Sequence, residues 1–192
     1  MVRNLLIGSL LSFALAAPAL AAVDHYTLDP DHTFPSFEAD HMGISVWRGK
    51  FNHSTGKVTI DREAKSGTVE VSVDVTSADF GQDALNEHMA KPEMFDTAKF
   101  PKATYKGKLA GFENGAPTKV VGDFTFRGVT KPLELKINKF KCIPHPMLKV
   151  ELCGADASAT FKRDDYGFDA GKDYGFDMSV NLRIQVEGLK DS

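Results

Sequence analysis

The sequence lacks the short motifs by which many enzymes are recognised. It contains no G-x-S-x-G segment, no phosphate-binding glycine loop and no catalytic-cysteine context. No candidate nucleophile has a base beside it. The six histidines include no pair with the close spacing of a zinc site, so a metal site would need ligands that the fold brings together. We therefore expect no catalytic residue, no metal and no cofactor.

Cysteine is scarce. The chain has two, Cys142 and Cys153, which flank the turn-rich segment CIPHPMLKVELC. We expect so close a pair in an exported chain to form a disulfide, worth about 3 kcal/mol through the chain entropy of the unfolded state. The spacing is not C-x-x-C, which makes a redox-active pair the weaker alternative.

Long apolar runs are confined to the N-terminus. Residues 1–21 combine Arg3, an uncharged apolar run and a small-x-small triplet that ends at Ala21. This pattern predicts a signal peptide that is cleaved after Ala21 and leaves one domain over residues 22–192. A retained membrane anchor is the weaker alternative, because Pro18 interrupts the run. The whole chain has 23 basic and 26 acidic residues, and cleavage removes one basic residue, Arg3. The resulting net charge of about −4 disfavours nucleic acid as a partner.

The mature sequence has little helical periodicity and reads as all-β. Runs of alternating apolar and polar residues, separated by turn residues, predict strands. The predicted strands cover residues 33–40, 43–51, 56–61, 67–75, 103–109, 119–127, 133–137, 155–161 and 178–187. Asn114-Gly115 predicts a hairpin turn, and Pro35 places the first strand at an edge or bulge. Eight or nine strands with short connections suit a closed antiparallel barrel or a sandwich, and we favour the barrel because closure removes exposed edges.

Alternation also predicts which residues point into the core. In the last strand Val180, Leu182, Ile184 and Val186 alternate with polar residues such as Arg183. The remaining candidates for inward positions lie in five other strands. They are Phe37, Ala39, Ile44, Val46, Phe51, Val58, Ile60, Val120, Phe124, Phe126, Leu133, Leu135 and Ile137.

One segment, at about residues 83–98, interrupts the β pattern with a short broken helix. Asp83 is placed to cap its first turn, and Pro92 ends one turn while being able to open another. Its apolar residues are flexible or aromatic, a composition suited to filling an irregular space. They are Leu85, Met89, Met94, Phe95 and Phe100. The segment is either a plug that completes the core or a lid over a ligand.

An acidic cluster lies in RDDYGFDAGKDYGFD. Paired carboxylates could serve glycoside chemistry or bind calcium, but the spacing is not that of an EF-hand. We expect a solvated loop at the rim of the barrel. The acidic residues are Asp164, Asp165, Asp169, Asp173 and Asp177.

Three ordered segments resemble the YceI-like polyisoprenoid-binding family. YTLDPDHTFPSFEADHMGISVWRGKFNHSTGKVTID is similar to the family's D-x-x-H-S-x-x-x-F-x-x-x-H opening, LNEHMAKPEMFDTAKFPKATY to its H-L-x-S-x-x-F-F-D segment, and GDFTFRGVTKPLEL to G-x-L-T-x-H-G-x-T-K-x-V. The matched positions are His32, Phe37, His41, Gly49, Phe51, His88, Phe95, Asp96, Pro101, Gly128, Thr130 and Lys131. The departures are Thr33 for Ser, Met89 for Leu, Met94 for Phe and Arg127 for His.

The resemblance implies a lipocalin-like, eight-stranded antiparallel barrel in the periplasm that holds an isoprenoid chain as a quinone, such as ubiquinone, or as a polyprenyl phosphate. It also implies that the Cys142–Cys153 pair is a subgroup feature, similar to that of neisserial members that bind ubiquinone. Combined with the inward positions, it predicts fifteen residues around the isoprenoid. They are Phe37, Ala39, His41, Ile44, Val46, Phe51, Leu85, His88, Met89, Met94, Phe95, Phe100, Phe124, Phe126 and Leu182.

The leading hypothesis is therefore a non-catalytic periplasmic carrier. One alternative is a lipid- or glycan-modifying enzyme that uses His88 and the acidic loop. Another is a stress or interaction protein whose barrel is filled by its own side chains. Transient contact with the membrane surface or membrane proteins, and a homodimer, remain open.

Overall fold

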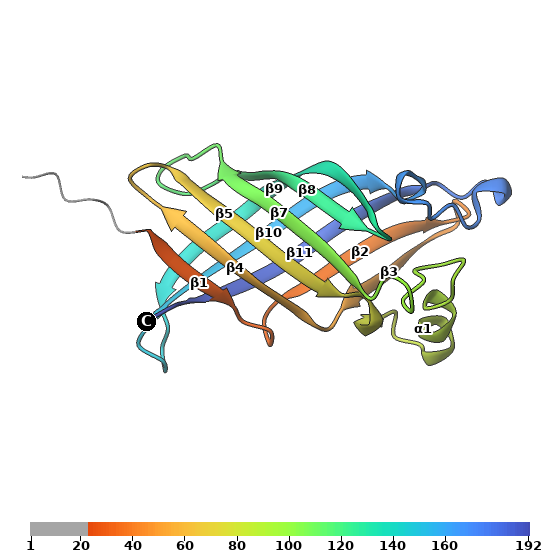
Figure 1. Ribbon diagram of the computed structural model, residues 1–192, viewed down its shortest axis with the longest axis horizontal. Coiled ribbons are helices and arrows are strands. Elements are labelled where there is room, and N and C mark those ends of the chain that lie inside the picture. Colours follow the sequence, from red (N-terminus) through yellow and green to blue (C-terminus); the bar gives the residue numbers. More distant parts are fainter. Residues whose placement is uncertain (1–22) are drawn as a thin grey trace, which may run out of the picture.

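The computed structural model describes residues 23–192, so the predicted signal peptide lies outside the described residues. One antiparallel sheet contains eleven strands (Figure 1). They are β1 (Asp24–Leu28), β2 (Phe34–His41), β3 (Ser45–Phe51), β4 (Ser54–Asp61), β5 (Ser66–Asp74), β6 (Ala78–Asp79), β7 (Lys102–Ala110), β8 (Lys119–Phe126), β9 (Val129–Pro144), β10 (Glu151–Lys162) and β11 (Ser179–Lys190). The helices are η1 (Val75–Ser77), α1 (Asp83–Met89), η2 (Arg163–Tyr166) and η3 (Lys172–Tyr174). None of these helices has the length and apolar character to span a membrane.

The sheet closes into an eight-stranded barrel because some of its strands share one position. The first half of β11 pairs with β2 and its last residues pair with β1, which also pairs with β4. In the same way β3 continues into β4, and β5 is followed by η1 and β6. Strands β7 to β10 complete the ring. The predicted all-β antiparallel barrel is confirmed.

The turns follow the chemistry of their residues. Asn114 and Gly115 both have positive φ, 50° and 80°, which is the conformation of a type I′ turn, and they join β7 to β8 as predicted. Pro35 pairs with Ile184 of β11, whereas the ladder with β3 begins only at Ser36. Pro35 has no N–H to donate, and it lies just before the first residue of β2 that pairs with β3. The missing donor therefore does not interrupt that ladder. Strand β1 was not predicted, because DHYTL is too short to show a clear period.

The helical segment differs in detail from the prediction. Helix α1 is capped by Gln82 rather than Asp83: Gln82 is extended, with φ −151°, and its side chain accepts a hydrogen bond from the Leu85 N–H. The helix ends at Met89, and the chain past Pro92 forms turns instead of a second helix. Asp96, with φ 52°, takes a left-handed conformation there that a continuing helix does not allow.

Candidate functional site

An apolar cavity of about 280 Å³ runs through the barrel. Its wall includes side chains from both buried clusters of the protein, from Phe95 near α1 to Tyr26, Leu109 and Cys153 at the other end. Asp40 and Arg163 are the charged residues that the described chain contributes to this wall. Because the cavity follows the length of the barrel, its shape suits a long apolar molecule better than a compact polar one.

Strand β11 supplies one full side of the cavity. Val180, Leu182, Ile184 and Val186 all line it, while Arg183 binds Glu38 on the outer surface. The predicted register of the last strand is therefore confirmed. Strict alternation was informative here because one face of the strand meets the interior and the other meets water.

The helical segment closes one end of the barrel. Met89 and Phe95 are buried, with exposed fractions of 5% and 6%, and both line the cavity. The ring of Phe95 is surrounded by other phenyl rings at centroid distances of 5.7 to 6.3 Å. These are Phe37, Phe51, Phe80, Phe126 and Phe168. The segment is thus both a part of the core and a wall of the cavity, and that it covers a ligand stays a prediction.

Backbone and side-chain bonds hold this segment in place. The Phe95 N–H donates to the Met89 carbonyl at 2.9 Å. Arg127, in the turn between β8 and β9, donates to the Met94 carbonyl, and its guanidinium lies 5.9 Å from the Phe100 ring centroid. Arg127 stands where the resemblance predicts His. Its longer side chain attaches the β8–β9 turn to the segment.

Aromatic residues form the rim at the same end of the barrel as α1, across the opening from that helix (Figure 1). Trp47 lines the cavity yet is 37% exposed, and His41 stacks on it with a centroid distance of 4.4 Å. Phe176 meets the edge of His41 at 5.4 Å and also lines the cavity. These half-exposed rings lie between the β2–β3 hairpin and the loop that follows β10, and we call them the mouth.

The loop after β10 is more than a solvated rim. Its sequence repeats Y-G-F-D, and each copy ends a short helix with a glycine of positive φ, Gly167 and Gly175. The phenylalanines that follow, Phe168 and Phe176, both line the cavity. The acidic residues remain outside, where Asp164 pairs with Lys172 at 2.7 Å and Asp165 with Lys131 at 3.2 Å.

The predicted ligand contacts divide into two groups. Nine of them line the cavity: Phe37, Ala39, Phe51, Met89, Met94, Phe95, Phe124, Phe126 and Leu182. Leu85 packs behind the lining, His41 lies at the mouth behind Trp47, and the Phe100 ring packs on Gly128. His88 is exposed on α1.

Ile44 and Val46 were predicted to point inward, and this was wrong. Ile44 is 78% exposed and Val46 is 47% exposed. The β2–β3 register pairs Ala39 with Trp47 and Asp40 with Val46, which places Trp47 on the cavity side and Val46 outside. Val46 and Phe51 are five positions apart, an odd spacing, and cannot share a face of one regular strand.

Several lining residues were missed. Trp47 has the same parity as Phe51, so the spacing allowed it to point inward but did not decide between it and Val46. The position between these two aromatic residues, Gly49, has no room for a side chain because the Phe37 ring covers it: a Cβ there would meet Phe37 Cζ at 2.6 Å. The repeat of Y-G-F-D was the signal for Phe168 and Phe176. Phe80 and Phe161 are single aromatic residues in their segments, and only the fold places them in or beside this wall.

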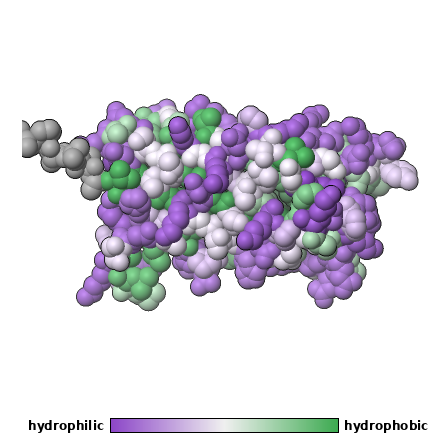
Figure 2. Space-filling model, viewed as in Figure 1, coloured by the Kyte–Doolittle hydropathy of each residue, from purple (hydrophilic) through white to green (hydrophobic). Residues whose placement is uncertain are grey.

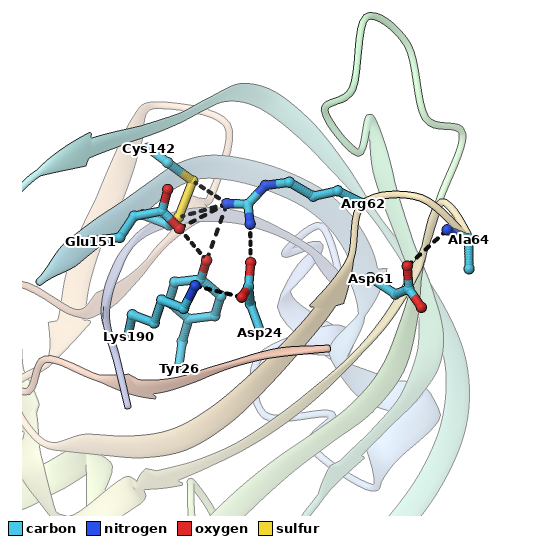
Figure 3. A network of polar contacts seen from close by, with 9 residues as sticks. Asp24, Tyr26, Asp61, Arg62, Ala64, Cys142, Glu151 and Lys190 are labelled. Atoms are coloured by element: carbon cyan, nitrogen blue, oxygen red, sulfur yellow. Dashed lines mark hydrogen bonds and ion pairs between the residues drawn. A yellow bond between two sulfur atoms is a disulfide. The ribbon is translucent and has the colours of Figure 1, made fainter. Parts of the chain in front are cut away.

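A polar network lies across the other end of the barrel (Figure 3). Arg62, in the β4–β5 turn, reaches across to Glu151 of β10 at 2.9 Å and to the Tyr26 hydroxyl at 3.1 Å. It also pairs with Asp24 of β1, which binds Lys190 of β11. Tyr26 is 1% exposed and lines the cavity beneath this network. The network therefore covers the end opposite α1.

The network shifts the pKa values of its members. Burial, then the hydrogen bond to Glu151, raises the pKa of Tyr26 to about 12. The hydrogen bond from Lys190 lowers the pKa of Asp24. Burial opposes ionisation of Glu151, but hydrogen bonds from Tyr26 and Arg62 outweigh it and lower the pKa of this carboxyl. Both carboxylates are therefore charged at neutral pH, and these shifts describe a structural closure.

The described residues offer one group of potential metal ligands, Cys142, Glu151 and Cys153, whose ligand atoms lie within 4.8 Å of one another. The two sulfurs are bonded to each other at 1.98 Å, which confirms the predicted disulfide. They are therefore not thiolates, and Glu151 is held by Arg62 and Tyr26. This group serves to join β9 to β10.

The chain is similar to known proteins along nearly all its length. A UPF0312 protein of Shewanella denitrificans is 29% identical over 194 residues, covering 98% of this chain and 100% of the relative. Burkholderia cenocepacia BcnA has a similar structure, with a TM-score of 0.65, 18% identity and coverage of 83% of this chain and 98% of that chain. A polyisoprenoid binding domain from Saccharophagus degradans, implicated in plant cell wall breakdown, has a TM-score of 0.61, 17% identity and coverage of 86% and 98%.

These solved structures have the same barrel fold as this chain. The family description that matches the sequence is the YceI-like domain, over residues 26–188. This match extends from β1, at one side of the closing seam, to β11 at the other. The chain belongs to the YceI-like domain family.

Proposed function

We propose that the protein is a non-catalytic carrier that holds a polyisoprenoid lipid inside its barrel. The observation that carries the proposal is the cavity itself, whose wall is apolar except at a few residues such as Asp40 and Arg163. Each CH₂ group that leaves water for such a wall contributes about 0.8 kcal/mol, so a chain of several isoprene units is bound without any polar contact. The polyisoprenoid binding domain from Saccharophagus degradans, which has the same fold, supports this choice of ligand class.

Within that class a quinone such as ubiquinone is favoured over a polyprenyl phosphate. A quinone headgroup is neutral, whereas a phosphate must find compensating charge once it leaves water. Arg163 is the one basic residue that the described chain places in the wall, and its guanidinium already lies 4.5 Å from the Phe168 ring centroid and donates to the Phe168 carbonyl. A neutral headgroup needs no compensating charge from this wall.

The enzyme alternative has less support. His88 is exposed on α1, and no hydrogen bond or ion pair within residues 23–192 joins it to the acidic loop. Asp164 and Asp165 are each paired with a lysine. A barrel filled by its own side chains is likewise not favoured, because a cavity of about 280 Å³ remains.

The carrier is proposed to act in the periplasm, on the strength of the signal-peptide pattern at residues 1–21. This location is tested separately, by cell fractionation and by N-terminal sequencing of the mature protein. Cleavage after Ala21 and recovery in the periplasmic fraction are expected. Recovery of the full-length chain from the cytoplasm would overturn the location without touching the ligand.

The ligand is tested by extraction of the purified protein with organic solvent and mass spectrometry of the extract. An isoprenoid quinone, near one molecule per chain, is the expected result. A polyprenyl phosphate would retain the carrier and replace the headgroup, whereas a fatty acid or an empty extract would reject the ligand class.

Two variants show whether the lipid lies in the cavity. Ala157 is 5% exposed and lines the wall, and its neighbour Ser158 faces outward. Ala157→Phe fills the cavity and should remove most of the lipid, while Ser158→Phe adds the same ring outside and should not. Both proteins are first checked for a cooperative melting transition. Equal lipid content in two folded variants would place the ligand elsewhere.

A further inference from the structure

The hairpin between β9 and β10 exposes apolar side chains at the end of the barrel away from α1. Met147 is 79% exposed, Leu148 is 55% exposed and Ile143 is 40% exposed. Figure 2 shows apolar residues gathered over this hairpin at the lower left, with hydrophilic surface around them. Figure 1 shows that the hairpin projects beyond the ends of the neighbouring strands. Nothing in the cavity or its closure uses these side chains.

The apolar surface continues from the tip onto the outside of the barrel. Leu152 lies opposite Ile143 of β9 on one side and Leu189 of β11 on the other. Residues directly opposite in a ladder point to the same face. Because Cys153 lines the cavity, Leu152 and its two partners face outward. Tip and row form one surface, which we call the hairpin patch, made of Ile143, Met147, Leu148, Leu152 and Leu189.

The tip is held in a fixed shape before any partner arrives. His145 Nδ1 accepts hydrogen bonds from the backbone N–H groups of Met147 at 3.1 Å and Leu148 at 3.0 Å. The backbone N–H of His145 donates to the Val150 carbonyl at 2.8 Å. The disulfide between Cys142 and Cys153 joins the two strands at the base of the tip. Binding through this patch therefore loses little conformational entropy.

Two lysines border the patch, although the whole chain has a net charge of −3. Lys141 lies on β9 and Lys149 lies at the tip, and neither forms an ion pair within residues 23–192. Lys139, farther along β9, lies opposite Asp156 of β10 and is not part of this border. The acidic group nearest in sequence, Glu151, is bound to Arg62 and the Tyr26 hydroxyl. An apolar tip with a basic border is complementary to an anionic lipid surface.

We propose that the hairpin patch docks the protein on a bilayer that contains anionic lipids. Met147 and Leu148 enter the boundary between headgroups and acyl chains, and Lys141 and Lys149 lie at the level of the phosphates. The proposal goes beyond the carrier function and does not depend on which molecule fills the cavity. Docked in this way, the barrel rests on the end covered by the Arg62 network and keeps its mouth away from that bilayer.

The test uses the mature protein and vesicles of phosphatidylcholine alone or with about 30% phosphatidylglycerol, separated by sedimentation. Binding to the anionic vesicles is expected, together with a strong decrease between about 0.05 and 0.5 M salt. Met147→Ser/Leu148→Ser and Lys141→Glu/Lys149→Glu should each lower the partition coefficient about tenfold or more. Absence of binding by the wild-type protein, or equal binding to both kinds of vesicle, would reject the proposal.

The opposite end of the barrel supplies a matched control. Met42 and Ile44, at the tip of the β2–β3 hairpin, are 54% and 78% exposed, so Met42→Ser/Ile44→Ser removes a similar apolar area near the mouth. This variant should bind as the wild type does. Loss of binding here instead of in the hairpin patch would show that the mouth docks.

The single tryptophan adds an independent readout, because Trp47 lies at the mouth. Its emission should not shift when vesicles bind, whereas a Leu148→Trp variant should gain a blue-shifted component. A blue shift of Trp47 would contradict the proposed orientation. If Met147→Ser/Leu148→Ser abolished a dimer seen by analytical ultracentrifugation and left vesicle binding intact, the patch would be a contact between copies and the proposal would be wrong.

Discussion

Phe95 lies at the point where the helical segment, the loop after β10 and three strands meet. Its ring contacts Phe51 of β3 and Phe126 of β8 as well as Phe168 of the Y-G-F-D loop. A phenyl ring buries a large apolar area, and each edge-to-face pair adds to that gain. One residue thus joins parts of the chain that no ladder of backbone hydrogen bonds connects.

Phe95→Ala should lower the free energy of unfolding by about 3–5 kcal/mol, the usual cost of truncating a buried phenyl ring. The measurement is denaturant unfolding of delipidated protein. Phe100→Ala, in the same segment but outside the cavity, is the control and should cost less, because its ring is half-buried against Gly128 and Arg127. Equal losses would mean that Phe95 is not the central residue of the cluster.

Among the elements, those with strict alternation were predictable and those with single aromatic residues were not. Strand β11 alternates over eight residues, so its register followed from the sequence. In β3 the run ISVWRGKF has apolar residues of both parities, and only pairing with β2 decides that Trp47 is inside and Val46 outside. The division of eight barrel positions among eleven strands depends on where β1, β3 and β5 end, and no local pattern marks those breaks.

The β9–β10 pair is the element in which a covalent bond should matter most. Cys142→Ser/Cys153→Ser should destabilise the protein by about 3 kcal/mol if chain entropy dominates. The melting temperature should then fall by about 6–12 °C for a domain of this size. Thiol labelling of the unreduced, denatured wild type is the companion measurement, and it should find no reactive thiol. Two labelled thiols per chain would contradict the disulfide.

At the scale of the whole molecule, the barrel depends on the seam between β1 and β11. The β1–β11 ladder is short, from Tyr26 opposite Lys190 to Leu28 opposite Gly188. Charged side chains reinforce it: Asp24 of β1 binds Lys190 of β11, and Arg62 joins Asp24 to Glu151 of β10. Closure of the sheet and closure of the cavity therefore rely on the same residues.

This arrangement predicts a pH-dependent contribution to stability. The pKa values of Asp24 and Glu151 are lower in the folded protein than their ordinary values of 3.8 and 4.5. The unfolded chain therefore binds more protons in the acidic range, and the free energy of unfolding rises with pH there. The contribution is complete above the ordinary pKa values and is lost as the pH falls through the lower, folded-state values.

Arg62→Met removes the charge and keeps much of the side-chain length. At pH 7 it should lower the free energy of unfolding by about 1.5–3 kcal/mol, the usual range for hydrogen bonds to charged groups. The difference in melting temperature between wild type and variant should begin to shrink as the pH falls below the ordinary values of 3.8 and 4.5, because protonation of Asp24 and Glu151 removes the charges that Arg62 binds. Lys119→Met, which removes an exposed pair with Glu134, is the control and should cost less than about 1 kcal/mol at any pH. A difference for Arg62→Met that stayed constant from pH 7 to about pH 3 would show that the arginine stabilises the seam by packing rather than by charge.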